Sequence, residues 1–167
     1  MKNLTHSEII SKIKASGYFN IKELVSEEVY KRDGERAWRY FDTRLLITIY
    51  FIRKKLDKGF NVNNWATAKA GDIIYDERGL RENISDIVSD KTKKRKLYLS
   101  GHTMGCAIDF KVSGLNSSEV RKWLLEIQNE LPFKIRLENT LNGKQISWVH
   151  LDVYDEDKNP KVYLMNL

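Results

Sequence analysis

Apolar side chains recur at helical spacing through the first 59 residues of the chain and predict three helices. The segment THSEIISKIKAS begins with a capping box, because Thr5 is followed three residues on by Glu8, and its isoleucines share one face. The segment NIKELVSEEVYKRDGERAW is a shorter helical stretch that we expect to close at Gly34. The third, DTRLLITIYFIRKKLDKG, should run from a cap at Asp42 to a stop at Gly59. We expect these helices to pack around one core.

From residue 105 onward the apolar positions alternate, which is typical of strands. Strands are predicted in CAIDFKV, FKIRLENT, ISWVHLDVY and KVYLMNL, and a helix capped by Ser117 or Ser118 in NSSEVRKWLLEIQNELP. The pair Asn142 and Gly143 predicts a two-residue hairpin turn between the second and third of these strands. Between the two halves FNVNNW reads as a strand, whereas residues 66–99 show no sustained periodicity, so a functional loop or lid is expected there.

These elements predict one α+β domain over residues 1–167, with an N-terminal helix in 1–20 and a core in 21–167 whose helices pack on a mainly antiparallel sheet. The chain has 167 residues, 41% hydrophobic and 31% charged, and is therefore long enough to bury a core. No apolar run approaches the roughly 20 residues that span a bilayer, and the first residues lack the apolar segment of a signal peptide. We therefore expect synthesis in the cytoplasm, no membrane insertion and a monomer.

The formal net charge of +6 indicates attraction to polyanions, and its densest patch is KTKKRK, residues 91–96. A solvated loop or an anionic cell-wall polymer accounts for this patch. No interleaved aromatic residues or nucleic-acid-binding motif surround it, so no nucleic-acid partner is expected.

Strand alternation brings a possible metal site together. Along ISWVHLDVY it separates Val149, Leu151 and Val153 from Trp148, His150, Asp152 and Tyr154. Along CAIDFKV it sends Asp109 and Cys106 to opposite faces, which argues against the single cysteine as a ligand. His102 lies just before that strand, and two histidines with one carboxylate are a ligand set of catalytic zinc. The remaining histidine, His6, lies in the first turn of the N-terminal helix and is assigned no role.

Two motifs carry a resemblance to a known family. SGHTMGCAIDF resembles the S-x-H-x-x-G-x-A-x-D motif, and SWVHLDV the W-x-H motif, of the zinc D-Ala-D-Ala carboxypeptidases and dipeptidases. That family includes the L-alanyl-D-glutamate endopeptidases of phage lysis enzymes. The segments KELVSEEVYKRDGERAWRYFD, RLL, VNNW and RGLR are similar to phage-associated members, so the resemblance runs from about residue 20 to 155. It implies a Hedgehog/D-Ala-D-Ala-peptidase-like fold.

The resemblance also implies roles for individual residues. Zinc would be held by His102, Asp109 and His150, with a fourth position open. An arginine upstream of the first ligand binds the substrate and stabilises the developing oxyanion in this family, and Arg81 matches it best, with Arg78 as the alternative. Ser100 and Trp148, which belong to the two motifs, are expected beside the substrate.

The chain departs from the family at the catalytic base. Members carry a glutamate three residues before the last histidine, and here that position is Ser147, which cannot shuttle a proton. In an ideal two-residue hairpin Glu138 lies directly across from Ser147 and could replace the missing carboxylate. That register puts Glu138 on the face opposite His150, so a bulge or a one-residue shift is required. Asp152, two residues past His150, is the alternative base or a partner that orients the histidine.

The sequence therefore predicts a zinc metallopeptidase that hydrolyses an amide bond in bacterial cell-wall peptide. It would act on the wall after release as a phage lysis enzyme, or from a virion. A carboxypeptidase and an endopeptidase share this chemistry, and both remain open. The rival hypothesis, motivated by Ser147, is a catalytically inactive zinc-binding or structural phage protein that keeps the fold.

Overall fold

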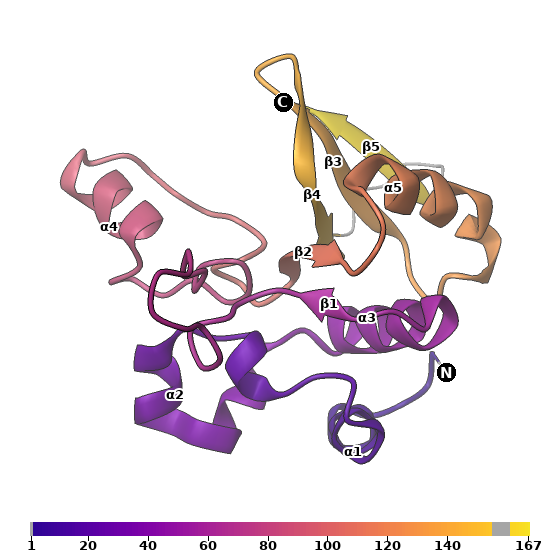
Figure 1. Ribbon diagram of the computed structural model, residues 1–167, viewed down its shortest axis with the longest axis horizontal. Helices are drawn as coiled ribbons and strands as arrows, with labels where there is room; N and C mark the ends of the chain where they lie inside the picture. The colour runs from indigo at the N-terminus through magenta and orange to yellow at the C-terminus, as the bar shows by residue number, and fades with distance from the viewer. Residues whose placement is uncertain (1, 155–160) are drawn as a thin grey trace.

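A sheet with the strand order β1-β2-β4-β3-β5 organises the residues that the computed structural model describes, 2–154 and 161–167 (Figure 1). Neighbouring strands run antiparallel except β3 and β5, which are parallel. The strands are β1 (Phe60–Asn61), β2 (Ala107–Val112), β3 (Ile135–Leu141), β4 (Lys144–Asp152) and β5 (Val162–Asn166). The prediction of a mixed helix and strand protein with a mainly antiparallel sheet is confirmed.

The helices precede the sheet or connect its strands. The α-helices are α1 (His6–Ser16), α2 (Glu27–Asp33), α3 (Thr43–Leu56), α4 (Asp86–Lys93) and α5 (Ser117–Glu126). Short 3-10 helices are η1 (Ile21–Glu23), η2 (Gly34–Tyr40) and η3 (Gln128–Glu130). The predicted second helical stretch is thus divided into η1, α2 and η2, because the Ser26 hydroxyl accepts from the backbone N–H of Val29 and starts a new helix there. No helix in the described part of the chain is both long and apolar enough to cross a membrane.

Side-chain caps fix most helix ends. The capping box of Thr5 and Glu8 on α1 and the Asp42 cap on α3 are confirmed. The predicted stop of α3 at Gly59 is wrong, because Asp57 itself adopts the left-handed conformation, with φ 50°, and its N–H donates to the Arg53 carbonyl.

The predicted serine cap of α5 is also wrong. Asn116 caps the helix, since its side chain accepts from the N–H of Glu119 while the Glu119 carboxylate accepts from the N–H of Asn116. Ser117 is thereby freed, and its hydroxyl donates to the Ile146 carbonyl of β4 at 2.8 Å. The start of α5 is therefore tied to the sheet.

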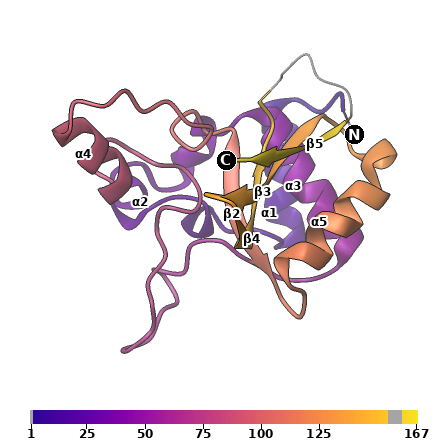
Figure 2. The ribbon, with the colours of Figure 1, turned by 90° about the horizontal axis from the view of Figure 1, so that it is seen from above.

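The long connection between β1 and β2 contains one helix that the sequence pattern did not predict. No residue of α4 is buried, so it has no apolar stripe to detect, and it stands apart from the sheet in both views (Figures 1 and 2). The predicted strand FNVNNW is limited to Phe60–Asn61. The next residues leave the sheet because the Asn63 side chain donates to the Val25 carbonyl and that of Asn64 accepts from the N–H of Tyr75.

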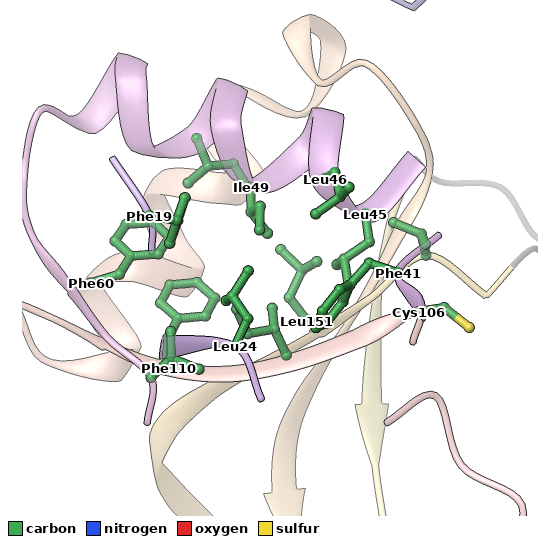
Figure 3. Packing of buried hydrophobic residues seen from close by; sticks show 14 of the residues in the cluster. Phe19, Leu24, Phe41, Leu45, Leu46, Ile49, Phe60, Cys106, Phe110 and Leu151 are labelled. Atoms are coloured by element: carbon green, nitrogen blue, oxygen red, sulfur yellow. The ribbon is translucent and has the colours of Figure 1, made fainter. Parts of the chain in front are cut away.

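One face of the sheet packs on helices to form the core. The aromatic rings of Phe60 and Phe110 stack with centroids 4.4 Å apart, and Leu151 of β4 lies against the α3 side chains Leu45 and Ile49 (Figure 3). Val149, Leu151 and Val153 are all buried, as strand alternation predicts. The opposite face of β2, β3 and β4 is thereby left for polar chemistry.

The β3-β4 hairpin contains the bulge that the sequence analysis required. Asn142 and Gly143 have φ values of 50° and 71°, as in a type I′ turn, and next to the turn Thr140 pairs with Gln145. Farther along the strands Glu138 pairs with His150, so residues 146–149 of β4 lie opposite a single residue of β3. The three extra residues are an odd number, and they bring Glu138 to the face of His150.

Candidate metal centre

Three side chains on the polar face of the sheet can hold a metal ion. Asp109 of β2 pairs directly with His150 of β4, and His102 lies in the turn that precedes β2. His102 is 2% exposed and Asp109 7%, and one ligand atom from each of the three lies within 4.8 Å of the others. The three residues that sequence spacing and alternation singled out therefore lie together in the structure.

Two of the three separations between these side chains match tetrahedral coordination. His102 Nε2 lies 3.2 Å from His150 Nδ1 and 3.3 Å from Asp109 Oδ2. Ligands about 2.0–2.1 Å from a tetrahedral metal are roughly 3.3–3.4 Å apart, which matches these two distances. His150 Nδ1 and Asp109 Oδ1 are closer, at 2.7 Å, as expected for a direct hydrogen bond that a metal would replace.

Each histidine is oriented from behind by an acceptor. His102 Nδ1 is 2.8 Å from the Gly79 carbonyl oxygen, and His150 Nε2 is 3.2 Å from Asp152 Oδ2. When these outer nitrogens donate, His102 Nε2 and His150 Nδ1 keep their lone pairs for a metal.

Both carboxylate oxygens of Asp152 accept hydrogen bonds from neighbouring residues. The Arg136 guanidinium donates to both its oxygens, from Nε at 2.8 Å and from Nη2 at 3.0 Å, and the N–H of Tyr154 donates to Oδ1 at 3.0 Å. Asp152 is 1% exposed. Of the two roles considered for Asp152, this arrangement favours orienting His150 over acting as the base.

The charges of the site are strongly coupled. Burial alone would raise the pKa of Asp109, but His102 and His150 hold it well below its usual range. Burial alone would lower the pKa of His150, but hydrogen bonds to Asp109 and Asp152 raise it to about 9. The site therefore favours an ionised Asp109 with positive charge held close to it.

The surroundings of Glu138 differ from those of the other two carboxylates in the site, Asp109 and Asp152. Glu138 is 8% exposed and lies beside His150 on the neighbouring strand, and its carboxylate accepts no hydrogen bond from the residues that the structure describes. Burial raises the pKa of Glu138. A carboxylate on a largely buried residue, with a raised pKa, is suited to proton transfer. Ser147, by contrast, is exposed.

Arg81 contacts one of the candidate ligands. Its Nη2 donates to Asp109 Oδ2 at 3.1 Å, while Nη1 donates to the Tyr98 hydroxyl at 2.8 Å and Nε to the Glu77 carbonyl at 2.8 Å. Arg81, Asp109 and Trp148 line a cleft with a volume of about 330 Å³. This places a guanidinium and an aromatic ring beside the candidate metal position.

The two other predicted residues, Arg78 and Ser100, make contacts of a different kind. Arg78 also lines the cleft, but its guanidinium lies 3.4 Å from the ring centroid of Tyr75. Ser100 is not among the residues that line the cleft. Its hydroxyl accepts from the N–H of Thr103 at 3.4 Å and so shapes the turn that carries His102. The expected substrate contact of Ser100 stays a prediction.

The remaining cysteine and histidine are structural. Cys106 is buried at the edge of the hydrophobic cluster, on the face away from Asp109, as predicted (Figure 3). His6 contacts Thr43 Oγ1 at 2.9 Å and the Trp38 carbonyl at 3.2 Å, and so fastens α1 to the start of α3.

Sequence reasoning missed the Gly79 carbonyl, Arg136 and Tyr98. Arg136 could have been found, because placing Glu138 beside His150 also places Arg136 beside Asp152. The other two lie in the long connection, where no periodicity fixes a neighbour.

Comparison with known proteins identified no relative: no family model, curated protein or solved structure matches this chain. The fold and site define a protein of mixed helices and strands with a buried His-Asp-His centre able to hold a metal ion.

Proposed function

We propose that this protein is a zinc-dependent peptidase with a Hedgehog/D-Ala-D-Ala-peptidase-like fold that hydrolyses an amide bond of bacterial cell-wall peptide. The observation that carries the proposal is the position of Glu138, a largely buried residue that pairs directly with the ligand candidate His150 on the neighbouring strand. A metal site that was only structural would not need such a group. The substrate class rests on the two sequence motifs.

The donor set fits zinc. Two imidazole nitrogens and one carboxylate group suit this ion, and three protein ligands leave a position open for catalysis. When bound, zinc would polarise the scissile carbonyl and lower the pKa of a water. Gly79 and Asp152 keep the two histidines in the tautomers that such binding requires.

The other residues of the site supply proton transfer and charge. Glu138 takes a proton from the attacking water and delivers it to the leaving amine. Arg81 lies at the cleft with its guanidinium beside Asp109, where it binds the substrate carbonyl or carboxylate and stabilises the negative charge that develops on oxygen. Trp148 offers an apolar wall to the peptide.

Metal analysis combined with digestion of purified peptidoglycan tests the proposal. The protein is expected to bind one zinc and to release peptides whose masses identify the hydrolysed amide. Chelation should abolish release, and added zinc should restore it. A zinc-loaded protein that cleaves no amide in peptidoglycan or in synthetic stem peptides would overturn the peptidase assignment.

A second candidate is a zinc-binding structural phage protein without turnover, and the serine at position 147 is the observation that favours it. The variant Glu138→Gln separates the two. The peptidase predicts that Glu138→Gln keeps zinc and loses about 10²–10⁴-fold in rate, the usual contribution of a general acid-base. If the protein is only structural, neither the original protein nor Glu138→Gln hydrolyses an amide bond.

The basic segment 91–96 bears on where the enzyme acts. It begins in the last turn of α4 and is mostly exposed, so it can concentrate the protein on an anionic wall after release or from a virion. Weaker wall binding at higher salt is the expected signature.

A further inference from the structure

A buried guanidinium lies on the core side of the sheet, behind the candidate site. Arg121 of α5 is 3% exposed and forms no ion pair with a carboxylate in the part of the chain that the structure describes. A buried charge without such a partner is costly, so it needs other compensation. Its hydrogen bonds show where the compensation comes from.

Arg121 donates to backbone carbonyls of the β3-β4 bulge. Its Nη1 lies 3.0 Å from the Trp148 oxygen and 3.5 Å from that of Glu138, and its Nη2 lies 3.2 Å from the Ile146 oxygen. Nη2 is also 3.1 Å from the Ser117 hydroxyl, which itself donates to the Ile146 oxygen. One rigid fork thus holds both strands of the hairpin across the bulge.

These carbonyls need a donor because of the bulge. Residues 146–149 have no register partner on β3, so the strand ladder does not satisfy their backbone groups on that side. Buried carbonyls left without donors destabilise the fold. Arg121 supplies donors at two of the four bulged residues.

The apolar pattern alone would allow another register. Leu137 and Leu151 must both face the core, which excludes the bulge-free hairpin but permits a bulge with one extra residue. In that register Glu138 would pair with Trp148, two residues or roughly 7 Å along the strand from His150. The wider bulge is what brings Glu138 level with the metal ligands.

We propose that Arg121 is a positioning residue that selects this wide bulge and thereby sets Glu138 beside His150. The kinetic consequence rests on the proposed peptidase function, whereas the structural consequence does not. Arg121 contacts the hairpin through backbone carbonyls, from the opposite side of the sheet to the chemistry.

The test compares Arg121→Met, which keeps the length of the side chain and removes the donors, with Lys122→Met on the exposed side of the same helix. NMR cross-strand contacts should link residue 138 with 150 in the original protein and in Lys122→Met, and with 148 in Arg121→Met. Zinc should remain bound in all three. Where Arg121→Met does not fold, Arg121→Lys, which keeps the charge but not the fork, carries the same comparison.

Kinetic measurements add a second test. If Arg121 only stabilised the fold, its loss would not change kcat in the way described next. Arg121→Met should lower kcat at least 100-fold, and adding it to Glu138→Gln should cause no further loss, because both changes remove the same proton transfer. Losses that multiply, or an unchanged contact between residues 138 and 150 in Arg121→Met, would overturn the proposal. If the original protein cleaves no amide, the peptidase function fails, and the NMR comparison still decides the role of Arg121.

Discussion

Gly105 is the position where a single methyl group tests how the ligand-bearing turn is fastened to the helices. It has φ of +67°, and its carbonyl accepts from the N–H of Asp42, the cap of α3, at 2.9 Å. A Cβ at this position would overlap the Tyr40 carbonyl oxygen and lie 2.9 Å from its carbon. The clashing atoms belong to the backbone of Tyr40 at the end of η2, so they cannot move aside as the end of a flexible side chain would.

The expected cost of Gly105→Ala has two parts. The left-handed conformation costs an alanine about 1–2 kcal/mol, and forcing a methyl group into a packed space costs about 1–3 kcal/mol more. Gly17 supplies a matched control, since its φ is also +67° and a Cβ there meets nothing within 4 Å. Gly17→Ala should therefore show only the first part, about 1–2 kcal/mol.

Urea unfolding of the metal-free proteins, followed by tryptophan fluorescence, measures both free energies, and equal m values would validate the comparison. Zinc affinity is measured by competition with a chelator. His102 lies three residues before Gly105, and its carbonyl accepts from the Gly105 N–H at 3.3 Å, so Gly105→Ala should also weaken zinc at least 10-fold. Equal destabilisation by the two alanines would refute the packing of Gly105 on Tyr40.

Three further changes test the site. Asp152→Asn should weaken zinc about 10–100-fold, because the second histidine ligand loses its orienting carboxylate, and an unchanged affinity in chelator competition would contradict that role. His102→Ala should abolish stoichiometric zinc in metal analysis, whereas His6→Ala, which removes a structural histidine, should retain it. Ser147→Glu should not restore peptide release in a Glu138→Gln background, since position 147 is exposed, and recovery of activity would show that the base belongs on β4.

The alternation of apolar and polar residues along the strands gave reliable predictions. It placed Val149 and Leu151 in the core and left His150 and Asp109 on the other face, because a period of two fixes a side chain to one face wherever the opposite face is buried. It could not find α4, which buries no side chain. The ends of α3 and α5 were missed for a different reason. Asp57 adopts a left-handed conformation that glycine usually supplies, and Asn116 caps helices about as well as the adjacent Ser117 and Ser118 do.

The bulge was within reach of the sequence, and it decides how the site is interpreted. Leu137 on β3 and Leu151 on β4 are both core residues, and a two-residue turn at 142–143 can never place them on the same face. The apolar pattern and the turn signal therefore conflict, and only an odd number of extra residues resolves the conflict. An odd number of extra residues also brings Glu138 to the face of the sheet on which His150 lies. The proposed peptidase is therefore compatible with a serine at position 147, because the bulge that folds the hairpin brings Glu138 of the neighbouring strand to the face of His150.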